Sequence, residues 1–132
     1  MTVVVDASVA AKWALKEEHS ASASALRTEE GLIAPSLIAA ELSSVFWKAF
    51  RRGTLSRTDA LTALLLSLRP FQELVATEGL HNQALSLAID LKHPVYDCFY
   101  LALAERENAP LVTADETMLA AARKAKIKVR RI

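Results

Sequence analysis

The sequence predicts an α/β fold in which a mostly parallel central sheet is flanked by helices. Short apolar runs rich in β-branched residues alternate with longer segments of helical composition, and the connections between them are short. At 132 residues, the chain is long enough to bury a core without disulfides or a structural metal. We therefore expect a single domain that covers residues 1–132.

Composition limits the location and the partners of the chain. Apolar residues make up 52% of the sequence, yet no uninterrupted apolar run approaches the ~20 residues that a membrane-spanning helix needs. The lack of a cleavable leader pattern and the single cysteine, Cys98, favour a reducing compartment, so we expect the cytoplasm and no membrane partner. Because the net charge is only +1, nucleic-acid binding requires a local basic patch.

The first part of the chain predicts a strand that feeds directly into a helix. Residues 2–6 (TVVVD) form the strand, and residues 7–15 have helical composition. A second helix is predicted over residues 19–28, and the short apolar run 32–35 follows it. Residues 36–53 predict a long, half-buried helix that ends in basic residues and a glycine. The apolar stripe of this helix consists of Leu37, Ile38, Leu42, Val45, Phe46, Ala49 and Phe50.

The rest of the chain continues the alternation of helices and strands. The predicted helices cover residues 56–70, 81–92, 95–108 and 116–126, and the predicted strands cover residues 71–77, 109–115 and 127–132. Pro94 stands where the first turn of a helix tolerates proline. In the last strand, Lys128 and Arg130 alternate with apolar residues, a pattern that protects an edge strand from aggregation.

Three aspartates occupy positions that suggest a ligand site. Asp6 and Asp115 each follow an apolar strand, and the carboxyl ends of parallel strands form the crevice in which α/β proteins bind ligands. Asp97 lies near the start of an apolar helix. A role as a helix cap explains each aspartate equally well when it is taken alone. Thr113 and Glu116 also have the spacing of a capping box.

Glu41 has no such alternative, because it lies in the middle of a predicted helix. Its neighbours three and four residues away include Leu37, Ile38 and Val45, so it lies on or beside the apolar stripe. A half-buried carboxylate without a partner costs several kcal/mol or takes up a proton. We expect Glu41 to meet the three aspartates in the crevice at the strand ends.

Four carboxylates that converge in one crevice require a cation. Two unit charges ~4 Å apart interact by about 1 kcal/mol in water and by about 4 kcal/mol at an effective dielectric constant of about 20. Ligand sets made only of oxygen favour Mg²⁺ or Mn²⁺ over zinc. Such an ion can orient a water molecule and stabilise the charge that develops on a phosphate. These residues therefore favour metal-dependent phosphoryl chemistry.

Four short motifs, in this order along the chain, resemble those of the PIN domain. They are VVVDAS, the segment APSLIAAELSSVFWK around Glu41, YDCFYLALAE and LVTADETMLAAA, and together they span essentially the whole chain. The resemblance is to the small VapC-type toxins of bacterial and archaeal toxin–antitoxin pairs. It implies a PIN-like three-layer fold, an acidic metal site and Mg²⁺- or Mn²⁺-dependent endoribonuclease activity on RNA. It also implies a VapB-like antitoxin as partner and a homodimer.

The resemblance assigns roles to individual acids. Asp6, Glu41 and Asp97 match the three acids most characteristic of the family. Asp115 matches the more variable fourth acid, and the adjacent Glu116 is the alternative at this position. These four matched acids are the predicted catalytic residues and the predicted ligands of Mg²⁺ or Mn²⁺.

Hydroxyl and basic residues complete the predicted site. Ser8 and Thr113 match small hydroxyl residues near the first and fourth acids, where they would contact an acid or a water on the metal. Local capping explains these two hydroxyls equally well. The predicted RNA contacts are Lys12, Lys48, Arg51 and Arg52. For the two arginines, a solvated position at a helix C-terminus is an equally good explanation.

Other reactive or bulky residues are predicted to lie outside the chemistry. His19, His81 and His93 have no histidine partner at i,i+4 spacing, and we expect surface or capping roles for them. Cys98 lies in an apolar stretch and is predicted to be a core residue. The residues predicted to lie in the core or between subunits are Trp13, Phe46, Trp47 and Phe50.

Two alternatives to the endoribonuclease hypothesis remain. The first is a degenerate PIN module that binds a protein partner without catalysis, although the complete set of four acids argues against it. The second is a phospho-acceptor domain, because receiver domains also place an aspartate after an apolar strand. The receiver hypothesis lacks a second acid at the first strand end, where position 8 is serine.

Overall fold

The computed structural model describes residues 1–15 and 20–132 and contains one five-stranded sheet. The strands are β1 (Val3–Val5), β2 (Leu32–Pro35), β3 (Glu73–Val75), β4 (Leu111–Thr113) and β5 (Val129–Arg131). Their order in the sheet is β3-β2-β1-β4-β5, and every neighbouring pair is parallel. The predicted α/β class with a parallel sheet is therefore confirmed, and the last strand lies at an edge as predicted.

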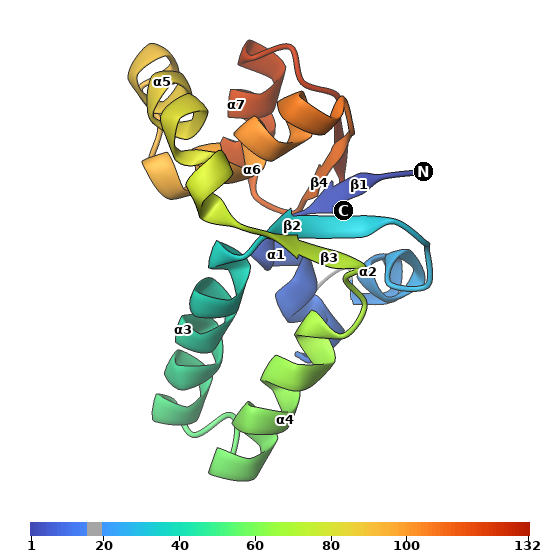
Figure 1. Cartoon of the computed structure of the whole chain (residues 1–132). Coiled ribbons are helices and arrows are strands. Elements are labelled where there is room, and N and C mark those ends of the chain that lie inside the picture. The colour runs from blue at the N-terminus through green and yellow to red at the C-terminus, as the bar shows by residue number, and fades with distance from the viewer. Residues whose placement is uncertain (16–19) are drawn as a thin grey trace.

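Helices cover both faces of this sheet, so the fold has three layers (Figure 1). Helices α1 (Ala7–Ala10), α2 (Ser20–Leu26), α3 (Leu37–Arg51) and α4 (Arg57–Leu68) lie on one side. Helices α5 (His81–Leu91), α6 (Val95–Glu107) and α7 (Glu116–Lys124) lie on the other side. Two short 3₁₀ helices, η1 (Ala11–Trp13) and η2 (Thr77–Gly79), complete the fold.

Most predicted helices and strands are present but end one or two residues short of the predicted bounds, and two segments near the start of the chain need separate comment. Residues 7–15 were predicted as one helix, but α1 ends after one turn and continues as the 3₁₀ helix η1. The helix predicted from residue 19 is described from Ser20 onward as α2, and residues 16–19, including His19, lie outside the described residues. Both differences fall before β2.

Strand β1 occupies the centre of the sheet because its side chains have no polar face. Val3, Val4 and Val5 are at most 3% exposed. The chain adds β2 and β3 on one side of β1 and then returns to add β4 and β5 on the other side. The order of the strands therefore reverses between β1 and β4. In open parallel sheets, this reversal opens a crevice at the carboxyl ends of the two strands.

Helix α3 carries the predicted stripe, but the stripe is not buried along its whole length. Ile38, Leu42 and Phe46 are at most 2% exposed, whereas Phe50 is 46% exposed. The prediction that Phe50 belongs to a buried stripe is wrong, because α3 and α4 project beyond the sheet as a pair (Figure 1). The last turns of α3 pack against α4.

A substantial part of the apolar composition remains on the surface. The exposed large side chains include Trp47, Phe50, Leu61, Leu65, Leu66, Leu85, Ile89 and Tyr96. They belong to α3, α4, α5 and α6. Among residues 1–15 and 20–132, no helix has both the length and the apolar character that a bilayer crossing demands.

Gly31 is the glycine on which the start of the sheet depends. Its φ of +81° is left-handed, and a Cβ here would collide with the Met1 carbonyl group. Gly53 has a similar φ of +79° but open space around it. We expect Gly53→Ala to cost roughly 1–2 kcal/mol of unfolding free energy from backbone strain, and Gly31→Ala to cost at least about 1 kcal/mol more. Urea unfolding of both variants measures the difference, and equal losses would contradict the close approach of residue 1 to Gly31.

Candidate active site

The reversal point between β1 and β4 gathers the four predicted acids. Asp6 directly follows β1, and one residue separates Asp115 from the end of β4. Glu41 lies on α3 on one side of the sheet, and Asp97 lies in the first turn of α6 on the other side. The acids interact electrostatically in two pairs, Asp6 with Asp115 and Glu41 with Asp97. Topology thus brings together carboxylates from four separate segments.

Asp6 is the buried member of this group, with an exposed fraction of 4%. Its Oδ1 accepts hydrogen bonds from Ser8 Oγ at 2.6 Å and from the Val9 backbone N–H at 3.3 Å. Its Oδ2 accepts from Thr113 Oγ1 at 2.5 Å. The Val9 bond makes Asp6 the N-cap of α1. Asp6 is therefore both a helix cap and the acid at the centre of a hydrogen-bond network.

Ser8 and Thr113 join the ends of β1 and β4 through this network. The Ser8 hydroxyl accepts from the Ala114 backbone N–H at 3.0 Å, and the Thr113 hydroxyl accepts from the Asp115 N–H at 3.0 Å. Each hydroxyl has one proton, which it donates to Asp6, so the 3.4 Å contact between the two hydroxyls is secondary. These side chains, one from α1 and one from β4, together hold the Asp6 carboxylate.

The capping box predicted from Thr113 and Glu116 is wrong. The N-cap of α7 is Asp115, whose Oδ1 accepts from the Thr117 backbone N–H at 3.0 Å and from its hydroxyl at 2.9 Å. Thr113 still belongs to β4 and is fully buried, so its hydroxyl bonds Asp6 instead. The strand predicted over residues 109–115 already included Thr113, and the position of Thr113 in β4 confirms that prediction.

Asp115 and Glu116 point in different directions. The repulsion between Asp115 and Asp6 shows that the Asp115 carboxylate lies near the buried acid. Glu116 is exposed and forms an ion pair with Arg131 of the neighbouring edge strand. Of the two alternatives for the fourth acid, Asp115 is the one that faces the crevice.

Glu41 receives a hydrogen bond that the sequence did not suggest. The hydroxyl of Tyr100, which is 1% exposed, donates to Glu41 Oε1 at 2.6 Å. Burial raises the pKa of Glu41, the bond from Tyr100 opposes that rise, and the charge of Asp97 adds to it. Tyr100 lies three residues after Asp97 on α6, and this spacing was the available signal because it places both on one helix face.

Asp97 has a local partner in His93. His93 Nε2 lies 2.8 Å from Asp97 Oδ2, and the two side chains are 11% and 27% exposed. The surface or capping role predicted for His93 is therefore wrong, whereas His81 is exposed as predicted. The signal was the i,i+4 spacing of a histidine and an aspartate, which a search for paired histidines overlooks. Asp97 itself does not cap α6, whose N-cap is Pro94.

The four predicted RNA-binding cations are not gathered at the acids. Lys12 lines an open depression of about 420 Å³ together with Ser8, Val45 and Asp115. Lys48, Arg51 and Arg52 are exposed on the distal half of α3. The Arg51 guanidinium lies 5.2 Å from the centroid of the Trp47 ring. Lys12 is thus the cation of this set that borders the crevice.

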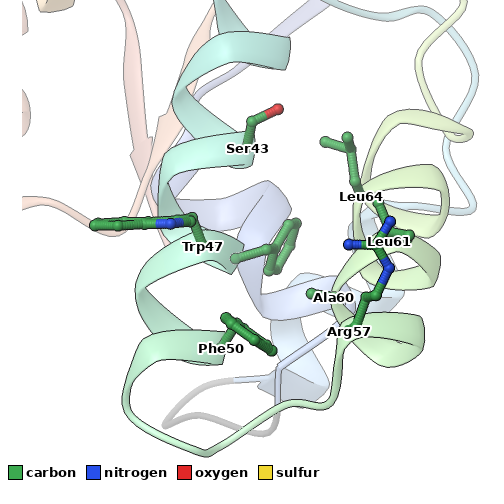
Figure 2. Close-up of a pocket in the computed structure, with 8 residues that line it drawn as sticks. Ser43, Trp47, Phe50, Arg57, Ala60, Leu61 and Leu64 are labelled. Atoms are coloured by element: carbon green, nitrogen blue, oxygen red, sulfur yellow. The ribbon is translucent and has the colours of Figure 1, made fainter.

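Trp47 and Phe50 line a separate groove between α3 and α4 (Figure 2). Its volume is about 300 Å³, and Leu61, Leu64 and Arg57 form its opposite wall. Of the other two predicted core or interface aromatics, Trp13 is buried in the core, and Phe46 is buried at the base of this groove. The groove lies along the projecting helix pair and not at the acids.

The comparison with known families agrees with this architecture. The family model described as PIN domain matches residues 3–124. The chain belongs to the PIN domain family. It is also 36% identical over 123 residues to Ribonuclease VapC3 of Pyrobaculum aerophilum, a match that covers 89% of this chain and 92% of that protein. The resemblance found in the sequence is confirmed.

Solved structures give the same result for the fold of this PIN domain. The PAE2754 protein from Pyrobaculum aerophilum matches with a TM-score of 0.76 and 26% identity, over 98% of this chain and 83% of that chain. FitAcB from Neisseria gonorrhoeae shares the fold with a TM-score of 0.65 at 15% identity, over 97% of this chain and 96% of that chain.

The PIN crevice offers a cation oxygen ligands from four carboxylates. This donor chemistry fits Mg²⁺ or Mn²⁺, and the repulsion within each acid pair is of the kind that a cation relieves. Among residues 1–15 and 20–132, however, no three Asp, Glu, His or Cys side chains are grouped so as to hold a metal ion. Hydrogen bonds from the chain turn each carboxylate toward a protein donor. Metal binding therefore requires the carboxylates to draw together.

Cys98 is excluded from the chemistry of the site. Its side chain is fully buried next to Asp97, and burial, followed by the charge of Asp97, raises the pKa of the thiol to about 11. A thiol with this pKa is not a nucleophile at neutral pH. The prediction that Cys98 is a core residue is confirmed.

Asp6 makes the stability of the metal-free protein depend on pH. Burial is the main reason that its pKa rises from 3.8 to about 6. The folded state therefore binds this proton more tightly than the unfolded state, and stability falls as pH rises from about 4 to 6. We expect the free energy of unfolding to increase by about 1 kcal/mol between pH 7 and pH 5, with Glu41 acting in the same direction.

Chemical unfolding of the EDTA-treated protein at both pH values tests this dependence. Asp6→Asn removes the titrating group and is expected to reduce the gain markedly. Asp90→Asn, at an exposed position on α5, is the control and keeps the full gain. An unchanged pH dependence in Asp6→Asn would contradict the raised pKa of Asp6.

Proposed function

We propose that this PIN domain is a Mg²⁺- or Mn²⁺-dependent endoribonuclease, the toxin of a VapBC-type pair, acting as a single domain in the cytoplasm. The observation that supports the proposal is the presence, toward the carboxyl end of the sheet, of two pairs of interacting acids, Asp6 with Asp115 and Glu41 with Asp97. The relative named Ribonuclease VapC3 supports RNA as the substrate. The reaction is hydrolysis of a phosphodiester bond.

The four acids would hold one or two divalent ions. When bound, such an ion lowers the pKa of the attacking water and stabilises the charge that develops on the scissile phosphate. Ser8 and Thr113 fix the orientation of Asp6 through their hydrogen bonds. Because Asp6 is held by Ser8 of α1 and Thr113 of β4, it is the rigid point of the site, whereas Glu41 and Asp97 are partly exposed.

Cations at the edge of the crevice would bind the RNA backbone. Lys12 lines the depression that contains Ser8 and Asp115, which favours a contact with a phosphate next to the cleaved bond. Lys48 is on the same face of α3 as Glu41, seven residues further along. Arg51 and Arg52 lie at the far end of this helix, and we propose a peripheral role in RNA binding for them.

Partners of the proposed toxin are a VapB-like antitoxin and a second copy of the chain. The VapC name of the relative supports the antitoxin. The apolar side chains exposed on α3, α4 and α5 support protein–protein contacts, because soluble monomers rarely expose many large apolar residues together.

The two alternative functions have less support. Receiver domains have the strand order 2-1-3-4-5, whereas the order here is 3-2-1-4-5, so the receiver hypothesis disagrees with the sheet as well as with the serine at position 8. A PIN module without catalysis would have no use for four acids whose mutual repulsion destabilises the fold.

Cleavage of structured RNA by the purified, partner-free protein tests the proposal. We expect discrete products with Mg²⁺ or Mn²⁺, none with EDTA, and rates at least about 100-fold lower for Asp6→Asn and Asp97→Asn, because each loses a metal ligand. Asp90→Asn on α5 is the matched control and retains the rate of the unmodified protein. Gel analysis of end-labelled RNA measures cleavage by the unmodified protein and by the three variants.

Other outcomes of this assay distinguish the alternatives. The absence of cleavage with every metal would favour the binding module. A stable acyl phosphate on Asp6 after incubation with a phosphodonor would favour the receiver class. Equal cleavage by Asp6→Asn and the unmodified protein would exclude Asp6 from the site.

Lys12 provides a separate test of RNA binding. We expect Lys12→Gln to weaken RNA binding for all sequences alike and to reduce the dependence of log K on log salt by about one unit, since one phosphate contact is lost. Lys124→Gln, at the exposed far end of α7, is the control and leaves the slope unchanged. Fluorescence anisotropy in EDTA at several salt concentrations measures both slopes. An unchanged slope in Lys12→Gln would remove Lys12 from the binding surface.

A further inference from the structure

Two residues, one in α6 and one just before it, contact the half-buried acids Glu41 and Asp97. Asp97 and Tyr100 are three residues apart in α6, which places their side chains on the same side of the helix. His93 lies just before the helix and contacts Asp97, and Tyr100 contacts Glu41 across 59 residues of sequence. The segment that supplies Asp97 therefore also brings a partner to each acid of the Glu41–Asp97 pair.

Tyr100 is a neutral group among negative charges. A phenol is protonated at neutral pH and can donate a hydrogen bond, and the carboxylate of Glu41 is its acceptor, with Oε1 2.6 Å from the Tyr100 hydroxyl oxygen. The ring is 1% exposed, so the hydroxyl has little freedom to move away.

His93 acts on Asp97 in the same way. An ionised carboxylate only accepts hydrogen bonds, so the 2.8 Å contact requires His93 Nε2 to carry the proton. The imidazole is 11% exposed and stands immediately before Pro94, whose ring restricts the backbone at the start of α6. Asp97 Oδ2 therefore accepts a hydrogen bond from the protein, and Oδ1 is left for another ligand.

We propose that Tyr100 and His93 are positioning residues that fix one oxygen of Glu41 and one oxygen of Asp97, so that the other oxygens face the divalent ion. The inference rests on the proposed nuclease function, because it concerns the same acids. Groups that hydrogen-bond a metal-binding carboxylate orient it, and their loss costs roughly 10–100-fold in metal affinity or activity. Asp6 already has two such donors, Ser8 and Thr113.

Tyr100→Phe tests the first of these bonds, because it deletes only the hydroxyl and keeps the buried ring. We expect the dissociation constant for Mn²⁺, measured by titration calorimetry without RNA, to rise roughly 10-fold or more. We also expect kcat for RNA cleavage to fall more than KM changes. Tyr96→Phe is the matched control on the same helix, since Tyr96 is 62% exposed, and both of its values stay within about twofold of the unmodified protein.

His93 allows a test by loss and rescue. His93→Leu keeps the volume of the side chain without a donor, and we expect it to weaken Mn²⁺ binding about 10-fold or more. His93→Gln restores an amide N–H near the position of Nε2 and is expected to recover most of that affinity. A role in packing alone would make the two variants alike.

The outcomes separate this inference from the proposed function. Mn²⁺ affinity in Tyr100→Phe equal to that of Tyr96→Phe would overturn the role of Tyr100, and equal affinity in the two His93 variants would overturn that of His93. If the unmodified protein binds Mn²⁺ but cleaves no RNA, the proposed function fails, while weaker Mn²⁺ binding in Tyr100→Phe still supports the positioning role.

Discussion

The buried carboxylate of Asp6 is the constraint on which the rest of the site depends. It lies at the end of the central strand and is 4% exposed, so each of its oxygens requires a donor from the protein. Ser8 from α1 and Thr113 from β4 supply these donors, and their oxygens then accept the backbone N–H groups of Ala114 and Asp115. The loop that carries Asp115 is thus held by the same network that satisfies Asp6.

The acids at the strand ends and the acids on the helices are held by different groups. The two strand-end acids, Asp6 and Asp115, are fixed by caps and hydroxyls, whereas Glu41 and Asp97 come from helices on opposite sides of the sheet and are held by Tyr100 and His93. Within each pair the two carboxylates repel each other, yet each of the four carboxylates has a hydrogen-bond donor in the protein. The fold therefore keeps the two pairs of acids close together despite the repulsion within each pair.

The sequence was sufficient to predict strands, helices and acids because these depend on local patterns. Apolar runs that end in Asp6 and Asp115 mark strand ends, and Glu41 is conspicuous on an apolar helix face. The hydrogen-bond partners were harder to predict, since the bond between Tyr100 and Glu41 joins residues 59 positions apart. The predicted contact of the Thr113 hydroxyl with an acid is confirmed by its bond to Asp6, whereas the alternative interpretation of Thr113 as part of a capping box is wrong. The contact between His93 and Asp97 is local, and its i,i+4 spacing was sufficient to suggest it.

The burial of β1 at the centre of the sheet explains how the fold tolerates the buried carboxylate of Asp6. A rise in the pKa of Asp6 from 3.8 to about 6 corresponds to about 3 kcal/mol of lost stability at neutral pH. Full burial of one valine contributes roughly 1.5–3 kcal/mol, and Val3, Val4 and Val5 are at most 3% exposed. The three valines together therefore outweigh the cost of the carboxylate that follows them.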